Sequence, residues 1–326
     1  MSFSSEVKEE LSRQISPARH CQIAEIAAII SMCGRVSISS TDDYALKVQT
    51  ENLAVARKYF TLLKKTFNIS TEVSVRQNAG QKRARTYTIG IKKHEESLRV
   101  LQAAKLLNPH MEVEENLSLL DNLVIQKTCC KRAFIRGAFL ATGSISDPQK
   151  FYHFEIVCTT IQKARQLQAM LHSFDTDAKI VQRKKYHVVY LKEGAQIVDM
   201  LNVMEAHTAL MNLENVRILK EMRNSVNRKV NCETANINKT VNAAVKQIED
   251  IQYLQSAIGL ERLSESLEEI ARLRLEHPEA TLKELGMMLT PQVGKSGVNH
   301  RLRKLSTLAK ELRESKEEKY YDKKTH

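Results

Sequence analysis

Basic, amide and hydroxyl side chains gather near the C-terminus, in the segment KSGVNHRLRKL at residues 295–305. Arginine pairs with guanine and asparagine with adenine in the major groove of DNA, and lysine neutralises phosphates. Leucines recur over 302–312 at helical spacing, which predicts a helix with one apolar face and one basic face, extended by Lys310 and Arg313. The segment is a candidate DNA-reading helix, and its candidate contacts are Lys295, Ser296, Asn299, His300, Arg301, Arg303 and Lys304.

The elements before this segment could position it against a DNA groove. Thr281 and Glu284 have the spacing of a helix-capping box, and Pro278 stops a preceding helix. Gly286 supplies the small residue that two closely crossing helices need, and a turn through 290–294 follows. Together these features predict a helix-turn-helix unit. A helical hairpin with a solvated basic face is the alternative.

An asparagine-rich segment, residues 224–242, precedes this unit. Asparagine favours turns over helix interiors, so we expect an ordered connector between domains. A helix is predicted to begin at Thr240 and to be capped by Gly259. The charged tail from residue 315 onward is predicted to be disordered.

The first two-thirds of the chain contain an internal repeat. Apolar stretches rich in small residues end at Gly34 and at Gly143, and each is followed by an extended segment, a helix and two alternating segments. We interpret the matching features as sharing an offset of 108 to 109 residues. Each repeat therefore predicts helix, hairpin, helix, hairpin, and two repeats predict a pseudo-symmetric α+β body.

Small residues on the two repeated helices have a physical use. Ala27 and Ala28 in the first copy, and Gly137 and Ala138 in the second, would let the two helix backbones approach closely at a two-fold axis. The terminal glycines would end these helices. This arrangement resembles the LAGLIDADG homing endonucleases, in which the signature helices form the interface between repeats.

The resemblance implies positions for catalytic acids, because in that family the residue before each terminal glycine is acidic and the two acids hold divalent metal. Here these positions are Cys33 and Thr142, and Ser31 and Leu140 occupy the other usually acidic place. Two-metal phosphodiester cleavage fails without carboxylate ligands. We expect a retained scaffold with no catalytic residue, metal or cofactor. An acid that reaches in from a loop is the alternative.

The sheets of that family form a saddle over duplex DNA, which makes the inferred hairpin tips candidate contacts with the DNA backbone. Such contacts position a protein without specifying sequence. A solvated charge run, or a saddle that binds another protein, are the alternatives. The basic residues at the two tips are Lys82, Arg83, Arg85, Arg183, Lys184 and Lys185.

Composition restricts the class of protein. Fifty Lys+Arg against 38 Asp+Glu give a formal net charge of +12, which indicates a polyanionic partner. The N-terminal segment lacks the apolar core of a secretory signal, and no apolar run is long enough for a membrane span. The six cysteines occupy no metal-binding spacing, so we expect reduced thiols in a cytoplasm and no zinc site.

The order of the parts is more specific than any single motif. The opening SFSSEVKEEL, the stretch GAFLATGSISDP, the connector NRKVNCETANINKT and the segment GVNHRLRKL together resemble the WhiA family of regulators from Gram-positive bacteria. The resemblance implies a sequence-specific DNA-binding transcription factor without nuclease activity, which acts in sporulation, cell division or chromosome segregation. It also implies DNA contact by residues 295–304.

We therefore expect four parts: a first degenerate LAGLIDADG-like repeat (1–110), a second (111–222), the connector with an all-α helix-turn-helix domain (223–314), and a disordered tail (315–326). The expected partner is double-stranded DNA at the nucleoid in the cytoplasm, with RNA polymerase or another regulator as a further candidate. A monomer with an internal pseudo-two-fold axis is expected. The competing functions are a nucleoid-associated scaffold that binds DNA through charge, and an active homing-type endonuclease.

Overall fold

The structure, a computed structural model, describes residues 2–38, 43–77, 85–107, 110, 113 and 122–322, with side chains through 315. The chain separates into two compact units, Met1–Glu221 and Met222–His326. Helix α8 (His207–Ile258) contains the junction between them. Among the described residues, every helix is too short or too polar to cross a membrane.

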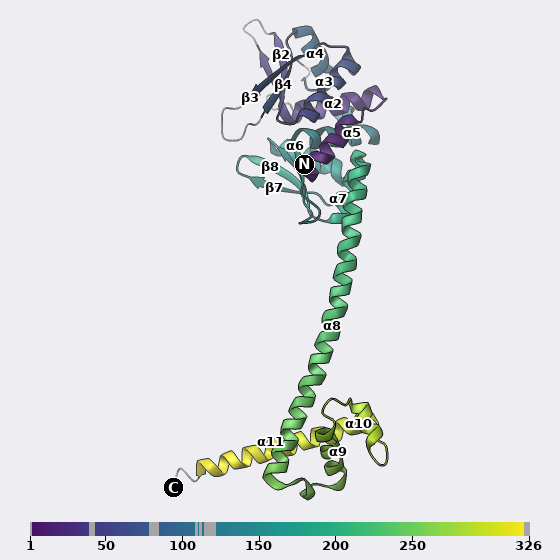
Figure 1. The fold of residues 1–326 in the computed structure, drawn as a ribbon. Coiled ribbons are helices and arrows are strands. Elements are labelled where there is room, and N and C mark those ends of the chain that lie inside the picture. The colour runs from purple at the N-terminus through teal and green to yellow at the C-terminus, as the bar shows by residue number, and fades with distance from the viewer. Residues whose placement is uncertain are drawn as a thin grey trace. The chain divides into compact units, whose positions relative to one another are not determined.

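Two copies of one α+β motif make up the N-terminal unit, after a short helix α1 (Phe3–Arg13) that buries Val7 and Leu11 (Figure 1). The elements of the first copy are α2 (Arg19–Cys33), β1 (Gly34–Ile38), β2 (Tyr44–Thr50), α3 (Leu53–Phe67), β3 (Glu72–Gln77), β4 (Arg85–Ile91) and α4 (His94–Ala103). Those of the second copy are η1 (Asn122–Ile125), α5 (Thr128–Thr142), β5 (Gly143–Ile145), β6 (Phe154–Cys158), α6 (Ile161–His172), β7 (Lys179–Arg183), β8 (Tyr186–Leu191) and α7 (Gly194–Met204).

Both copies fold their strands into an antiparallel sheet of the same order, β1-β2-β4-β3 and β5-β6-β8-β7. The predicted α+β fold with a repeated helix and two hairpins is thereby confirmed. The predicted uniform offset is wrong, however, because the strand ends Ile91 and Leu191 are only 100 residues apart. The outer hairpin of the first copy contains the longer link, residues 78–84, whereas Lys184 and Lys185 alone join β7 to β8.

Helices α2 and α5 lie side by side at the centre of this unit (Figure 1). A Cβ atom added at Gly137 would lie 2.6 Å from the carbonyl oxygen of Glu25 and 2.9 Å from Cβ of Ala28. Only glycine fits there, so the predicted close approach of the two backbones is confirmed. Gly34 and Gly143 follow these helices as predicted, but with extended φ values of −78° and −81° rather than left-handed ones.

Helix α8 is continuous over 52 residues, and the asparagine-rich segment 224–242 lies inside it. The prediction that a helix begins at Thr240 is therefore wrong. Asparagine costs a helix no more than about 0.7 kcal/mol per residue relative to alanine, far less than proline, and α8 contains neither glycine nor proline. Gly259 ends the helix with a φ of 79°, as predicted.

The C-terminal unit packs the end of α8 against η2 (Leu260–Arg262), α9 (Glu265–Glu276), α10 (Leu282–Met288) and α11 (Lys295–Asp322). Its core consists of buried aliphatic residues from each of these elements. The backbone of α11 is helical through Asp322, which corrects the expectation of a disordered tail from residue 315. This part of the sequence contains neither glycine nor proline, so nothing local stops the helix.

Candidate nucleic-acid interface

Cys33 and Thr142, the positions that would carry catalytic acids, line one cleft of about 580 Å³ at the C-terminal ends of α2 and α5. Each side chain donates to the carbonyl oxygen four residues earlier in its own helix: Cys33 Sγ to Ile29 at 3.2 Å, and Thr142 Oγ1 to Ala138 at 3.5 Å. Burial raises the pKa of Cys33 to about 12, so near neutral pH this side chain is an uncharged thiol. The two positions thus lie together, but neither supplies a negative oxygen ligand.

The charged side chains in and near this cleft are mainly cationic rather than acidic. Lys8 lines it, and burial lowers the pKa of its ammonium group to about 8. Lys163 is only 5% exposed, donates to the Ser31 carbonyl oxygen, and lies near enough to act electrostatically on Cys33. Among the residues that line the cleft, Glu51 is the one carboxylate, and it is exposed. One exposed acid opposed by two lysines is a poor ligand set for paired divalent ions.

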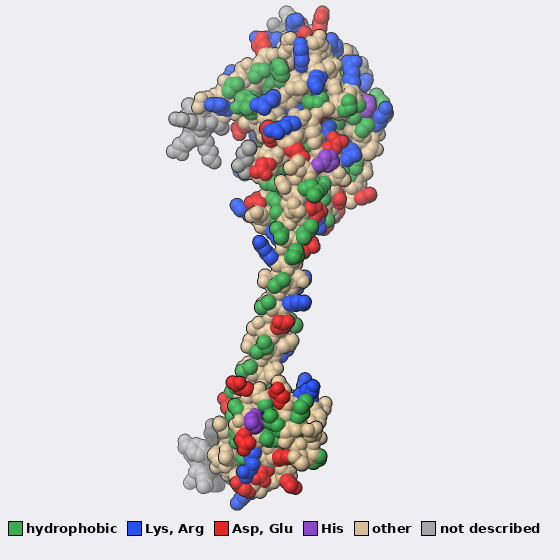
Figure 2. Space-filling view, turned by 45° about the vertical axis from the view of Figure 1, so that its right-hand side comes forward, with side chains coloured by type: hydrophobic (Ala, Val, Ile, Leu, Met, Phe, Trp, Pro, Cys, Tyr) green, Lys and Arg blue, Asp and Glu red, His purple; other side chains and the backbone are tan. Residues whose placement is uncertain are grey.

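Lys and Arg side chains are spread over the N-terminal unit among acidic and apolar ones, on the face drawn in Figure 2. At the predicted hairpin tips, Arg85 is exposed at the start of β4. Arg183 Nη1 lies 2.8 Å from Glu155 Oε2, so its charge is already partly neutralised. Lys184 and Lys185 are exposed in the turn between β7 and β8. The other two predicted tip residues, Lys82 and Arg83, lie outside the described residues.

In the C-terminal unit, a capping box and a glycine determine how α10 approaches α11. Thr281 and Glu284 form the predicted capping box, with the Glu284 carboxylate accepting from the Thr281 backbone N–H at 2.7 Å. A Cβ atom at Gly286 would lie 2.1 Å from the Val293 carbonyl oxygen. Glycine is therefore required where the turn before α11 crosses α10, as the sequence predicted.

Buried apolar residues determine which side of α11 faces the core, and they are Val298, Leu302, Leu305 and Ala309. The opposite side of the helix starts with Ser296, His300 and Arg303, all exposed. Their spacing of four and three residues places them in one row along the outer face. This row is the part of the predicted DNA-binding segment that points most directly away from the core.

The other predicted contacts flank that row. Lys295 and Lys304 are exposed, whereas Asn299 and Arg301 are half-buried. Within the part of the chain that the structure describes, none of the seven predicted side chains makes an ion pair or a hydrogen bond. Of the two arginines among these candidates, Arg303 is exposed and Arg301 is half-buried, so Arg303 has the more outward position.

Further along α11, the predicted extension of the basic face by Arg313 is not supported. Arg313 Nη1 contacts the buried Asp250 carboxylate at 2.8 Å, and its guanidinium lies 4.6 Å from the ring centroid of Tyr253. Arg313 therefore fastens α11 to the end of α8. Lys310 remains exposed, with Glu314 at 3.6 Å.

Two clusters of side chains between α2 and α5, one of charged residues and one of His and Cys, could not be predicted from local sequence patterns. In the first, Glu25 is fully buried and contacts Lys58 Nζ at 3.0 Å and Arg136 Nε at 3.2 Å. Arg136 also reaches Glu205 at 2.7 Å. These charges come from α2, α3, α5 and the residue that follows α7, so only the tertiary fold brings them together.

The second cluster brings together side chains with metal-ligand atoms that no sequence spacing had connected. Ligand atoms of His20, Cys21, Cys129 and Cys130 all lie within 4.8 Å of one another. The four residues form two adjacent pairs on two helices, which no single-segment motif describes. The 109-residue offset of α2 and α5 was the available signal, because it maps the first pair onto the second.

Comparison with known proteins agrees with this architecture. Three family models match: the "WhiA N-terminal LAGLIDADG-like domain" at 19–107, the "WhiA LAGLIDADG-like domain" at 131–223 and the "WhiA C-terminal HTH domain" at 226–309. The solved structure of full-length DUF199/WhiA from Thermatoga maritima shares the fold, with a TM-score of 0.57 at 24% identity over 95% of this chain and 99% of that one.

Two relatives named "Probable cell division protein WhiA" match along nearly their whole length. The protein from Lachnoclostridium phytofermentans is 58% identical over 96% of this chain and 100% of its own length. The protein from Alkaliphilus oremlandii is 48% identical over 97% of this chain and 99% of its own length. On the strength of these matches, together with two LAGLIDADG-like repeats followed by a helix-turn-helix domain, the chain belongs to the WhiA family.

Proposed function

We propose that the chain is a sequence-specific DNA-binding transcriptional regulator that reads base edges with the start of α11. The observation that carries this proposal is the exposed row Ser296, His300 and Arg303, which has no internal partner among the described residues and sits on a helix held by α10. A bidentate contact from arginine to guanine discriminates by about 1–3 kcal/mol against other bases. Lys295 and Lys304, at the sides of the row, are suited to phosphates.

The relatives support a biological setting for this proposal. Their names refer to cell division, which supports control of genes for cell division, chromosome segregation or sporulation. The chain would act on double-stranded DNA in the cytoplasm, at the nucleoid, with RNA polymerase or another regulator as a further partner. The internal pseudo-two-fold repeat of the N-terminal unit supports a monomer as the working form.

Selection of binding sites from a random duplex library by the full-length chain tests sequence reading. We expect a defined motif, and Arg303→Ala should weaken binding to it by roughly 10–100-fold while leaving binding to a scrambled duplex nearly unchanged. Fluorescence anisotropy with both duplexes measures the effect. The matched control is Arg272→Ala on α9, which removes the same charge from a side chain paired with Glu268.

Two results would contradict the proposal. Selection that yields no motif would remove sequence specificity. Equal losses of affinity for Arg303→Ala and Arg272→Ala, on motif and scrambled duplex alike, would show that α11 contributes charge rather than base reading.

We further propose that the chain does not cleave DNA. The cleft at Cys33 and Thr142 offers one exposed carboxylate and two nearby lysines, which disfavours paired divalent ions. Plasmid carrying the selected motif should stay intact during incubation with the purified protein and Mg²⁺ or Mn²⁺. Specific cleavage products would overturn this proposal, and loss of those products in Glu51→Gln would identify the loop acid as responsible.

A further inference from the structure

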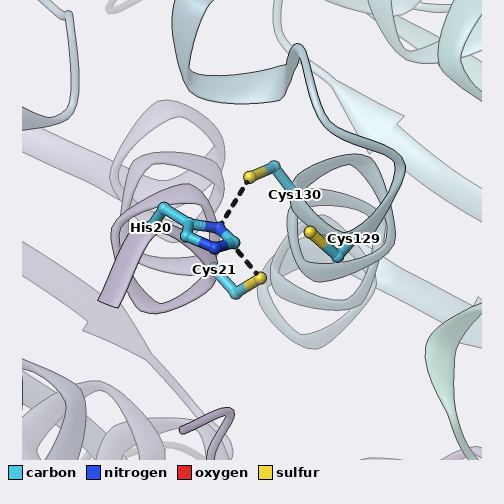
Figure 3. A group of neighbouring side chains, drawn as sticks. All are labelled: His20, Cys21, Cys129 and Cys130. Atoms are coloured by element: carbon cyan, nitrogen blue, oxygen red, sulfur yellow. Dashed lines mark hydrogen bonds between the residues drawn. The ribbon is translucent and has the colours of Figure 1, made fainter. Parts of the chain in front are cut away.

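Four side chains with soft metal-ligand atoms meet where helices α2 and α5 begin (Figure 3). His20 and Cys21 lie in the first turn of α2, and Cys129 and Cys130 lie in the first turn of α5. The pseudo-symmetry of the unit relates position 20 to 129 and position 21 to 130. The quartet therefore lies at the end of the helix pair opposite to Cys33 and Thr142.

The geometry points to a zinc site, and we propose that His20, Cys21, Cys129 and Cys130 bind one Zn²⁺ ion. Zinc at about 2.3 Å from sulfur and about 2.1 Å from nitrogen holds tetrahedral ligands roughly 3.5–3.8 Å apart. His20 Nδ1 already lies 3.2 Å from Cys130 Sγ and 3.3 Å from Cys21 Sγ. Because no pair of ligand atoms exceeds 4.8 Å, side-chain rotation can close the set around an ion.

The chemistry of the donors selects the metal and its role. Thiolate sulfur and imidazole nitrogen favour zinc over magnesium or calcium, which need oxygen ligands. Three cysteines and one histidine fill all four tetrahedral positions, which is typical of structural rather than catalytic zinc. The ion would tie the beginning of α2 to the beginning of α5, across the interface of the two repeats.

The surroundings of the quartet suit a cluster with net negative charge. Three thiolates around Zn²⁺ carry a net charge of −1, and the first turn of a helix stabilises negative charge through its exposed backbone N–H groups. Cys21 and Cys129 line a cavity of about 390 Å³ beside the quartet. Cys21 and Cys130 are buried, whereas His20 and Cys129 are exposed, which leaves a route for the ion to enter.

Metal analysis of the full-length protein tests the site directly. Protein reduced, loaded with Zn²⁺ and desalted should retain about one zinc per chain. His20→Ala and Cys130→Ser should each weaken zinc binding at least about 10-fold in competition with a chromophoric chelator. His20→Cys keeps four ligands and should retain the ion. The matched control is Cys232→Ser, which removes an exposed cysteine of α8 and should leave zinc content unchanged.

Cobalt(II) substitution gives an independent signal, because tetrahedral thiolate sites produce intense visible absorption. Cys129→Ser should abolish this absorption. Circular dichroism of the variant should report an intact fold. Wild-type protein that retains less than about a tenth of an equivalent after loading with Zn²⁺ would overturn the proposal. So would a disulfide within the quartet with no bound metal, or stoichiometric iron in its place. None of these readouts involves DNA, so the zinc site stands or falls separately from the proposed function.

Discussion

Glu25 is a fully buried carboxylate between two cations, Lys58 and Arg136, that come from two other helices. Glu205 contacts Arg136 as well, so two acids balance two bases. The repeat does not reproduce this cluster, because the position equivalent to Glu25 in α5 is Phe134. Buried ion pairs add little net stability over apolar packing, yet loss of one partner is costly because the other charge stays buried. The cluster therefore makes the α2–α5 interface depend on one acid.

Substitution of that acid should be severe. Glu25→Gln leaves Lys58 and Arg136 without their shared carboxylate, so we expect the free energy of unfolding to fall by about 3–5 kcal/mol. Urea denaturation of the full-length protein measures it. Glu9→Gln is the control, because Glu9 forms an exposed pair with Arg13 and should contribute less than about 1 kcal/mol. Equal losses for both variants would contradict a special role for Glu25.

Lys8 predicts a pH dependence of stability. Burial lowers its pKa from 10.5 to about 8, so between these values the folded protein binds fewer protons than the unfolded chain. The contribution of Lys8 to the free energy of unfolding therefore rises with pH across this window. Lys8→Met should be at least as stable as wild type below pH 8. As pH rises toward 10.5, the free energy of unfolding of the wild type should increase relative to that of Lys8→Met.

Urea denaturation at several pH values measures the free energy of unfolding of wild type and Lys8→Met. The contributions of the other titrating groups are common to both proteins, so they cancel in the difference. Cys33, with its pKa raised to about 12, stays protonated through the window and does not interfere. A constant difference between the two proteins would show that Lys8 titrates normally in the folded state.

Residues of the candidate sites were predictable where their signal was local. Cys33 and Thr142 directly precede the glycines that follow two helices, so their positions can be read along the chain. The relative exposure of Arg301 and Arg303 was not predictable in detail, because it depends on which side of α11 packs on the core. The zinc quartet escaped prediction because its two halves belong to helices far apart in sequence.

Among the elements, prediction succeeded where caps and periodicity agreed and failed where composition was used alone. The capping box at Thr281 and the left-handed Gly259 mark helix ends correctly because both act through their own backbone neighbours. The asparagine content of segment 224–242 does not predict its structure, since a moderate helix penalty per residue does not interrupt a helix that lacks glycine and proline. The repeat predicted two copies of the same helix, hairpin, helix, hairpin unit, whereas the longer first hairpin changed the offset between them.

The crossing of α10 with the turn before α11 yields a prediction at the scale of these elements. Gly286→Ala places a methyl group 2.1 Å from the Val293 carbonyl oxygen, so the turn or α10 must shift. We expect a loss of about 1–3 kcal/mol in stability of the C-terminal unit, with weaker binding to the selected DNA motif. Thermal denaturation and anisotropy measure both effects. Gly294→Ala is the matched control in the same turn, because a Cβ there meets nothing within 4 Å.

At the scale of the whole molecule, the net charge of +12 explains attraction to DNA but not choice of sequence. A regulator that reads bases and a scaffold that binds through charge would both carry such an excess. What distinguishes them is how the free energy of binding divides between phosphate contacts, which depend on salt, and base contacts, which do not. Exposed lysines beside the α11 row and the arginine within it make this division measurable.

Salt titration of full-length protein on selected and scrambled duplexes separates the two functions. Lys304→Ala should reduce the slope of log affinity against log salt by about 1 on both duplexes, because one phosphate contact is lost. Arg303→Ala should lower affinity for the selected duplex alone, as expected for a base contact. The ammonium group of Lys310 already lies near Glu314, so Lys310→Ala should leave both slopes unchanged. Indistinguishable binding of the two duplexes at every salt concentration would favour the scaffold, because charge neutralisation does not depend on base sequence.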